Sequence, residues 1–142
     1  LDNGQMVMDF GLLKGAVRDV VDSFDHAIAI WDKDDAEYIA YAKKYSHRWA
    51  LLPVSPSAEQ FSRLIFVAVD AVLREFTFAN GEANVELHSV IVHETESGYA
   101  QCFREDAYSK KMGEIDLKSV FFSDDVKKDW SASQILAKIF KN

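Results

Sequence analysis

The sequence contains very little cysteine: Cys102 is the only one among 142 residues. A single thiol excludes an internal disulfide framework and is typical of a protein in a reducing compartment. Gln101 and Phe103 flank Cys102 and would not activate its thiol, so a structural role is favoured over a nucleophilic one. We therefore predict a cytoplasmic protein without internal disulfide bonds.

Positive charge and long apolar runs are also scarce. The 16 Lys and Arg residues are outnumbered by 23 Asp and Glu residues, which leaves a formal net charge of -7. An acidic chain is repelled at long range by nucleic-acid backbones and by anionic membranes. No run approaches the roughly 18 apolar residues of a membrane span. These absences predict no nucleic-acid partner and no membrane partner, and they favour a small molecule or a protein as the ligand.

The strong motifs of several enzyme classes are missing as well. The sequence has no glycine-rich phosphate loop and no CxxC, GxSxG or HExxH pattern. His88 and His93 lie five residues apart in a predicted strand, where they would face opposite sides, so they do not form a metal-binding pair. The remaining candidates are therefore isolated polar residues at the ends of predicted elements.

Two amphipathic helices dominate the pattern that is present. After a turn-like segment at residues 2–4, Asp9 can cap a helix whose apolar residues recur at helical spacing up to about Phe24. The serines and the proline of residues 55–60 predict the start of a second helix, which continues to about Phe76. Both helices have one apolar face, and each face needs a partner to cover it.

The predicted strands are too few for these helices. Residues 84–95 and 99–104 predict a hairpin, which alone is marginal in water. The chain also begins without methionine, in a turn sequence that would connect two strands, so we expect further strands upstream of Leu1 or from neighbouring subunits. Residues 32–48 predict an exposed helix and residues 130–140 a short amphipathic one.

Asp25 and His26 stand where the apolar stripe of the first helix ends. In the functional interpretation His26 titrates near neutral pH and moves a proton, while a carboxylate holds its tautomer. Adjacent residues on a helix diverge, so Asp25 can orient His26 only where the backbone is irregular. In the alternative interpretation the imidazole caps the last carbonyls of the helix and Asp25 is solvated.

Glu94 stands at the end of the predicted strand at residues 84–95, just before a turn. An ionised carboxylate accepts two parallel N–H bonds, so it matches the amino-pyrimidinone edge of a pterin or a guanine. The alternative is an exposed glutamate at a strand end. The residues next to Glu94 do not decide between these two interpretations. The residues next to Asp25 and His26 do not decide between theirs either.

Four short motifs, taken in order, resemble the 6-pyruvoyl and 6-carboxy-tetrahydropterin synthase family. They are GQMVMDF at residues 4–10, FDH at 24–26, SPSAEQ at 55–60 and VHET at 92–95. The corresponding family pattern is G-M-V-x-D-F, then L-D-H, then P-T-x-E-N, then an E-T strand end. Four weak motifs in one order are more specific than any one of them, so the resemblance favours the functional interpretations of Asp25, His26 and Glu94.

The resemblance implies the tunnelling fold, an α+β architecture in which an antiparallel sheet carries two helices on one face. Such subunits assemble around a pore, so a homo-oligomer, either a trimer or a hexamer, is expected. We divide the chain into a partial pterin synthase-like domain at residues 1–104 and a C-terminal extension at residues 105–142 with a short helix. The N-terminal part of the domain is expected to be missing here, and its strands, together with neighbouring subunits, would complete the sheet.

The resemblance also implies a zinc-dependent lyase that acts on 7,8-dihydroneopterin triphosphate. The three zinc-binding histidines and a proton-accepting cysteine are expected upstream of Leu1, so none of them is assigned here. The implied catalytic residues are Asp25, His26 and Glu94, and the implied substrate-binding residues are Glu94, Thr95, Ser57 and Glu59. Glu94 and His26 are expected to face one cavity. Candidates for binding the triphosphate are Lys14, Arg48, Arg63 and Arg104.

The residues of this sequence do not determine which reaction product is formed. The bacterial branch of the family, which these residues resemble most, yields 6-carboxy-5,6,7,8-tetrahydropterin for queuosine (deazapurine) synthesis. The other branch forms a 6-pyruvoyl product by elimination of triphosphate. A catalytically silent pterin-binding or scaffold homologue is a third alternative.

Overall fold

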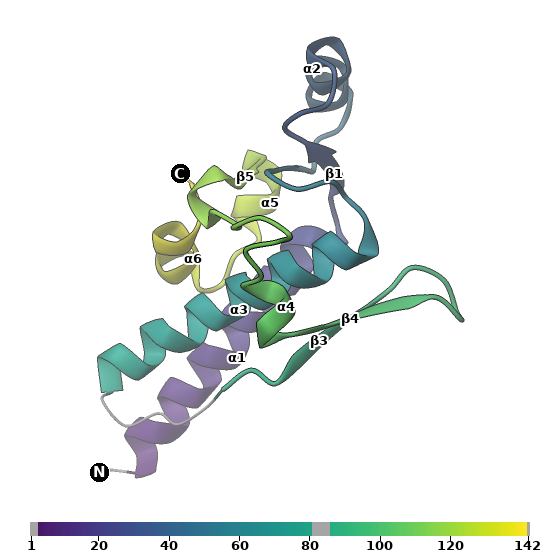
Figure 1. Ribbon diagram of the computed structural model, residues 1–142. Helices are drawn as coiled ribbons and strands as arrows, with labels where there is room; N and C mark the ends of the chain where they lie inside the picture. Colours follow the sequence, from purple (N-terminus) through teal and green to yellow (C-terminus); the bar gives the residue numbers. More distant parts are fainter. Residues whose placement is uncertain (1–2, 81–85, 142) are drawn as a thin grey trace.

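The computed structural model describes residues 3–80 and 86–141 and has an α+β architecture (Figure 1). Its elements in chain order are α1 (Asn3–Asp25), β1 (Ile28–Trp31), α2 (Ala36–Tyr45), β2 (Trp49–Leu52), α3 (Ala58–Asn80), β3 (Ser89–His93), β4 (Tyr99–Phe103), α4 (Arg104–Ala107), the 3-10 helix η1 (Leu117–Ser119), β5 (Phe121–Phe122), α5 (Asp124–Lys128) and α6 (Ser133–Ile139). None of the helices in this part of the chain combines the length and the apolar character that a membrane span requires.

The two long helices, α1 and α3, pack against each other as the apolar stripes predict (Figure 1). The hydroxyl of Ser57 accepts a hydrogen bond from the backbone N–H of Gln60 at 3.2 Å and so caps α3. The predicted end of α1 is confirmed at Asp25, but α3 continues beyond Phe76 to Asn80. The first helix therefore ends, and the second begins, close to the predicted site residues.

The predicted start of the first helix is wrong. Helix α1 already includes Asn3 and Gly4, where a turn was predicted, and it continues through Asp9, which therefore cannot be its cap. The following Gln and Met residues at positions 5, 6 and 8 are good helix formers, and they outweigh the local turn signal. A short turn motif is thus a weaker signal than the helical segment that follows it.

Strands β3 and β4 form the predicted antiparallel hairpin, in which Val90 pairs with Cys102 and Ile91 with Gln101. The hairpin packs against α3. Strand β3 begins at Ser89, later than predicted, and residues 84 and 85 of the predicted strand lie outside the described residues. The α+β fold class is confirmed, whereas completion of the sheet by upstream strands and neighbouring subunits stays a prediction.

A second, three-stranded sheet was not predicted from the sequence. Strand β1 pairs in parallel with β2, and β2 pairs antiparallel with β5, in the order β1-β2-β5. Helix α2 connects the two parallel strands and lies within the predicted exposed helix at residues 32–48. Each strand is only two to four residues long, and β5 comes from a distant part of the chain, so local periodicity could not reveal the pairing.

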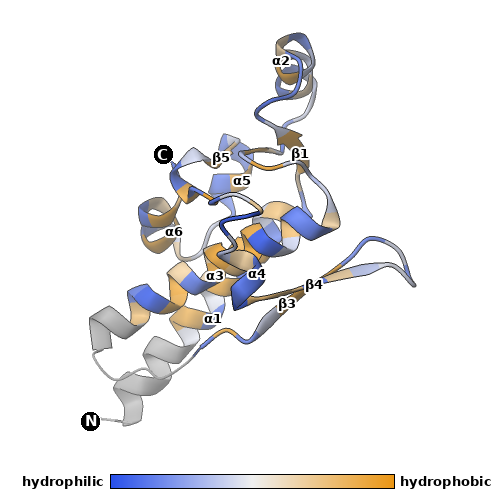
Figure 2. Cartoon of the chain, viewed as in Figure 1, coloured by the Kyte–Doolittle hydropathy of each residue, from blue (hydrophilic) through white to orange (hydrophobic). Residues whose placement is uncertain are grey.

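The hydrophobic core joins α1 and α3 to the segment after residue 104. The ring of Phe24 on α1 lies 5.2 Å from that of Phe122 on β5, which in turn lies 5.0 Å from that of Phe140. The predicted C-terminal helix is confirmed as α6, and its Leu136 is fully buried in this core. Figure 2 shows hydrophobic residues along α3, interrupted by polar ones, and hydrophobic residues on β1. Residues 105–141 thus share one core with the preceding part of the chain.

Candidate functional site

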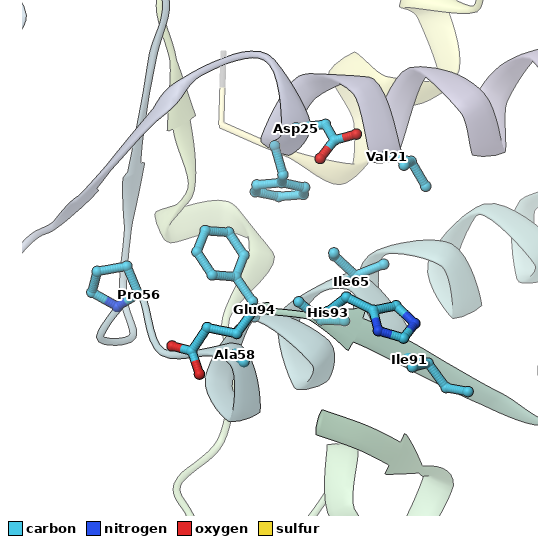
Figure 3. Close-up of a pocket in the computed structure, with 11 residues that line it drawn as sticks. Val21, Asp25, Pro56, Ala58, Ile65, Ile91, His93 and Glu94 are labelled. Carbon is cyan, nitrogen blue, oxygen red and sulfur yellow. The ribbon is translucent and has the colours of Figure 1, made fainter. Parts of the chain in front are cut away.

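A cavity of about 480 Å³ opens between the end of α1, the start of α3 and the end of β3 (Figure 3). Its apolar lining includes Phe24, Phe61, Ile65, Ile91 and Val92. Three polar side chains also line it, namely Asp25, His93 and Glu94. A mostly apolar cavity of this volume with a few convergent polar groups is typical of a small-molecule site.

A tight turn fixes the position of Glu94 at the end of β3. The backbone N–H of Glu94 donates to the carbonyl of Gly98 at 2.9 Å, and the Gly98 N–H donates to the Thr95 hydroxyl at 2.8 Å. A Cβ at position 98 would lie 2.9 Å from that hydroxyl oxygen, which explains the glycine. Thr95 therefore holds the turn, and its predicted contact with substrate stays a prediction.

Asp25 is the last residue of α1, and its carboxylate lines the same cavity as Glu94 (Figure 3). The preceding Phe24 is buried in the core and anchors the helix end there. Within residues 11–76 and 86–141, neither carboxylate is involved in a hydrogen bond or an ion pair through its side chain. Two such carboxylates can accept hydrogen bonds from the N–H groups of a ligand.

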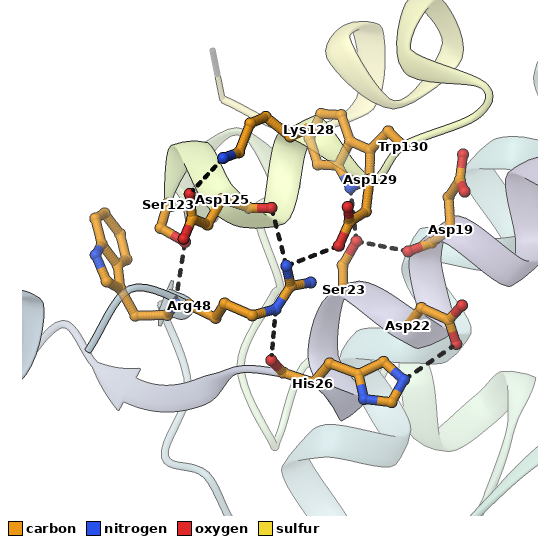
Figure 4. A network of polar contacts seen from close by, with 11 residues as sticks. Asp19, Asp22, Ser23, His26, Arg48, Ser123, Asp125, Lys128, Asp129 and Trp130 are labelled. Carbon is orange, nitrogen blue, oxygen red and sulfur yellow. Dashed lines mark hydrogen bonds and ion pairs between the residues drawn. The ribbon is translucent and has the colours of Figure 1, made fainter.

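His26 faces a different side of the helix end from Asp25. Its Nε2 lies 3.9 Å from Oδ1 of Asp22, one turn earlier, and it lines a separate cavity of about 70 Å³ together with Ser23 and Arg48 (Figure 4). The backbone remains helical here, because the His26 N–H donates to the Asp22 carbonyl at 3.1 Å. Successive residues of a helix diverge by about 100°, so the two neighbours separate. Of these two cavities formed by the described residues, one is lined by Glu94 and the other by His26.

The ion pair of His26 is thus with Asp22, whereas Asp25 was predicted to orient the imidazole. Both side chains of this pair are more than half exposed, so the pair is weak. The predicted catalytic roles of His26 and Asp25 stay predictions. Within the single chain, Asp25 and Glu94 line the same cavity.

The other two predicted substrate-binding residues flank the cavity without lining it. The hydroxyl of Ser57 caps α3, and Glu59 is exposed in the first turn of that helix. Between and beside them, Pro56, Ala58 and Phe61 line the cavity. Binding roles for Ser57 and Glu59 stay predictions.

Arg63 was a candidate for binding a triphosphate, and its burial rules this out. Its side chain is only 1% exposed. The guanidinium donates to the Gln60 side chain and to the carbonyl oxygens of Asp106, Ala107, Ser109, Met112 and Gly113, at distances of 2.6 to 3.4 Å. Gly113 has a φ of 91°, a left-handed conformation that favours glycine. Arg63 thus holds the loop after α4 in place.

A second polar cluster joins α3 to the segment after the hairpin, around the buried carboxylate of Asp70. The Arg104 guanidinium donates to both carboxylate oxygens of Asp70 at 3.1 Å, and the Tyr108 hydroxyl also donates to Asp70. Burial acts to raise the pKa of Asp70, but the hydrogen bonds from Arg104 and Tyr108 outweigh it and hold that pKa below its usual value. Burial and the bond to Asp70 raise the pKa of Tyr108 to about 12. Arg104 is therefore already engaged with a carboxylate.

Arg48 ties the C-terminal extension to the end of α1 (Figure 4). Its guanidinium donates to the His26 carbonyl at 2.9 Å, the Asp125 carbonyl at 2.9 Å and the Asp129 carboxylate at 2.7 Å. Nearby, Trp130 Nε1 donates to the Ser23 hydroxyl at 2.7 Å. Sequence analysis missed these roles because each depends on residues more than 70 positions apart in the chain or on backbone carbonyls, which leave no local pattern.

The residues described do not by themselves fit the zinc ion that the resemblance implies. No group of three His, Cys, Asp or Glu side chains among residues 11–76 and 86–141 could hold a metal ion. Burial, followed by the nearby charge of Asp106, raises the pKa of the Cys102 thiol to about 11, which disfavours the thiolate. The zinc site expected upstream of Leu1 stays a prediction.

Comparison with known sequences agrees with the motifs. The sequence profile of the family described as 6-pyruvoyl tetrahydropterin synthase matches residues 1–105 of this chain. The chain belongs to this family. The chain is also similar to 6-carboxy-5,6,7,8-tetrahydropterin synthase of Helicobacter pylori strain J99, with 30% identity over 143 aligned positions that cover 100% of this chain and 72% of the relative. The enzyme of the same name from strain 26695 is 29% identical over the same coverage.

The profile match and the relatives extend over different parts of the chain. The family profile ends at residue 105, whereas both Helicobacter relatives align along the whole chain, including the segment that forms α5 and α6. The similarity to these relatives therefore includes the C-terminal segment that Arg48 and Arg63 attach to the two long helices.

Proposed function

We propose that the protein is a lyase of the pterin synthase type that converts 7,8-dihydroneopterin triphosphate to 6-carboxy-5,6,7,8-tetrahydropterin. The observation that carries this proposal is the cavity that Asp25 and Glu94 both line, in a chain whose relatives along its whole length have that enzyme name. The fold alone would not decide between activities, because one fold supports several. The product would serve queuosine synthesis in the cytoplasm.

Glu94 is the proposed anchor for the pterin ring. A carboxylate at the end of a rigid strand can accept two parallel N–H bonds from the amino-pyrimidinone edge. The rings of Phe24 and Phe61 lie 6.1 Å apart and offer an apolar lining for the flat ring system. Hydrogen bonds fix the turn behind Glu94, so little conformational entropy would be lost on binding.

Asp25 is the proposed second polar contact, at the opposite wall of the cavity from β3. As an acceptor it can hold an N–H or a hydroxyl of the substrate, and as a base it can take a proton from one of them. The imidazole of His93 lines the cavity too. These side chains bind and orient the substrate in a cavity that is otherwise apolar.

His26 remains the proposed proton relay, through the motif that it shares with the family. Since it lines a different cavity from Glu94 within one chain, we propose that this role depends on the assembled homo-oligomer, a trimer or a hexamer. Zinc, where bound by ligands outside the residues described, would supply Lewis-acid activation of the substrate side chain. The proposal for Glu94 and Asp25 depends on neither.

Binding of 7,8-dihydroneopterin to the full protein, measured by calorimetry, tests the role of Glu94. Hydrogen bonds to a charged group contribute roughly 1.5–3 kcal/mol each, so Glu94→Gln should weaken binding by about 10-fold to 100-fold. Glu96→Gln is the matched control, because Glu96 is exposed in the same turn but does not line the cavity. Equal affinities of the two variants would refute the role of Glu94.

Turnover of the triphosphate, followed by mass spectrometry, tests the reaction. A 6-carboxy product supports the proposal, a 6-pyruvoyl product supports the elimination reaction, and binding without turnover supports the silent homologue. His26→Ala should lower kcat and leave the affinity for 7,8-dihydroneopterin within about twofold, as expected for a group that acts in the transition state. A His26→Ala variant with the wild-type rate would contradict the relay.

A further inference from the structure

Helix α2 projects from the rest of the molecule (Figure 1), and it carries an exposed stripe of aromatic side chains. Its members Tyr38, Tyr41 and Tyr45 are 45%, 63% and 64% exposed. Spacings of three and four residues place all three on one face of the helix. The rings of Tyr41 and Tyr45 lie 4.7 Å apart, so part of the stripe is already ordered as a continuous surface. Exposed tyrosines at this density are typical of an interface.

The face of α2 that adjoins the tyrosine stripe holds the helix to the molecule. Ala42 is buried there, and the Lys43 ammonium lies 4.8 Å from the centre of the Trp49 ring at the start of β2. The tyrosine stripe is therefore not needed to attach α2 to its own chain. It remains available to another molecule.

The charges of α2 indicate which molecule that is. The helix has the acidic Glu37 in its first turn and the basic Lys43 and Lys44 in its last turn. Glu37 and Lys44 are both exposed and lie seven residues apart, so they occupy the same flank of the tyrosine stripe. A helix that is acidic at its start and basic at its end on one flank is complementary to an antiparallel copy of itself.

We propose that α2 is a self-association surface through which two copies of this chain pack helix against helix in antiparallel orientation. A two-fold axis near Tyr41 places Tyr38 opposite Tyr45 of the partner subunit. The same axis keeps each flank on its own side, so Glu37 lies opposite Lys44 of the partner subunit, and the symmetry repeats this pair. The contact is independent of the proposed catalytic site.

The size of the surface predicts a weak contact. A stable interface buries about 800 Å² on each partner, and three partly exposed tyrosines on a ten-residue helix supply only part of that area. The contact should therefore depend on protein concentration in the micromolar range. Where other surfaces already join several chains, α2 would link two such assemblies, because the helix lies at the periphery of the molecule (Figure 1).

Sedimentation velocity of the full protein over a range of concentrations tests the surface. Tyr41→Glu places a charge at the centre of the stripe and should abolish the concentration-dependent species. Its matched control is Tyr41→Phe, which keeps the ring and should retain that species. Wild-type protein that shows no concentration dependence, or a Tyr41→Glu variant that associates like the wild type, would overturn the proposal.

Charge reversal separates antiparallel pairing from any other use of α2. Glu37→Lys alone and Lys44→Glu alone each bring like charges together across the axis, so each variant should associate at least about tenfold more weakly than the wild type. Mixing the two variants pairs every lysine with a glutamate of the other chain and should restore association. Unchanged melting temperatures show that the variants fold. If the mixed variants do not associate, the antiparallel arrangement is refuted. If every variant associates as the wild type does, the chains associate through another surface and the proposal is refuted.

Discussion

Two groups of carboxylates in this molecule differ in how they are used. Asp19 and Asp70 are almost fully buried, and each accepts several hydrogen bonds. Asp25 and Glu94 line an open cavity, and in the part of the chain whose side chains are described they accept none. The first group holds segments together that are distant in the sequence. The second group leaves its hydrogen-bonding capacity available to a ligand.

This difference shows how charged side chains with a structural role can be distinguished from those with a functional role within one chain. A buried charge must be paired or hydrogen-bonded, because leaving it unpaired costs several kcal/mol. A charge that has no partner and lines a cavity is kept for something that the chain itself does not contain. The same distinction applies to the arginines, since Arg63, Arg48 and Arg104 are all engaged with acceptors of their own chain.

The largest loss of stability should come from Arg63. Replacing it with methionine removes the donors for five carbonyl oxygens and for the Gln60 side chain, so Arg63→Met should lower the free energy of unfolding by about 3–5 kcal/mol. Urea denaturation measures this. Arg74→Met on the same helix is the control. Arg74 is exposed, and among the residues with described side chains its ion pair is the 3.9 Å contact with Asp70, so the cost should stay below about 1 kcal/mol. Similar costs for both would contradict the structural role of Arg63.

Asp19 should follow with a smaller effect. Its carboxylate accepts hydrogen bonds from the backbone N–H of Ala132 at 2.6 Å and from the Ser131 hydroxyl at 3.1 Å, just before α6. Asp19→Ala should therefore cost about 2–3 kcal/mol and increase hydrogen exchange in α6. Asp22→Ala, one turn along α1 at an exposed position, should cost less than about 0.5 kcal/mol. Slow exchange in α6 of the Asp19→Ala variant would show that other contacts suffice.

Cys102 should give a pH effect of intermediate size. Burial raises the pKa of its thiol from the usual 9.0 to about 11. An unfolded chain therefore loses this proton before the folded chain does, so stability is full below about pH 9 and falls as pH rises to about 11, by at most about 1.4 kcal/mol per pH unit. Cys102→Ala should show a shallower decrease over this interval in parallel urea titrations. Equal slopes would mean that the thiol titrates normally.

The smallest effect on stability should come from the cavity. Glu94→Gln and Asp25→Asn remove charges that have no partner within the part of the chain that is described, so each should change the free energy of unfolding by less than about 0.5 kcal/mol. The same urea titrations measure this change. A cost comparable to that of Asp19→Ala would place these carboxylates in the structural group, and the contrast between the two groups would be lost.

Much of the fold could be predicted where one element contains its own signal. Helix α3 has an apolar stripe and a serine cap, and the β3–β4 hairpin has β-branched strands around a turn. The sheet β1-β2-β5 has no comparable signal, because its strands are short and its pairing joins Leu51 to Phe121. Local periodicity does not contain information about partners that distant in the sequence.

The sequence predicted which element ends carry the polar residues of the candidate site, but not which of these residues line the same cavity. The end of α1 at Asp25 and the strand end at His93 placed the polar residues correctly at element termini. Asp25 lines the same cavity as Glu94, whereas His26 lines a different one. This difference depends on the rotation of the last turn of α1, which the Asp-His dipeptide does not reveal. The satisfied arginines were missed because most of their acceptors are backbone carbonyls, which every residue has.

The way Arg63 holds its loop affects how this family can diverge. The loop is recognised almost wholly through its carbonyl oxygens, so substitutions at positions such as 109 and 112 leave those hydrogen bonds unchanged. Gly113 is the exception, since its left-handed backbone disfavours any other residue. Homologues can therefore accumulate sequence differences along this loop while the chain keeps the same path, provided that one arginine and one glycine persist.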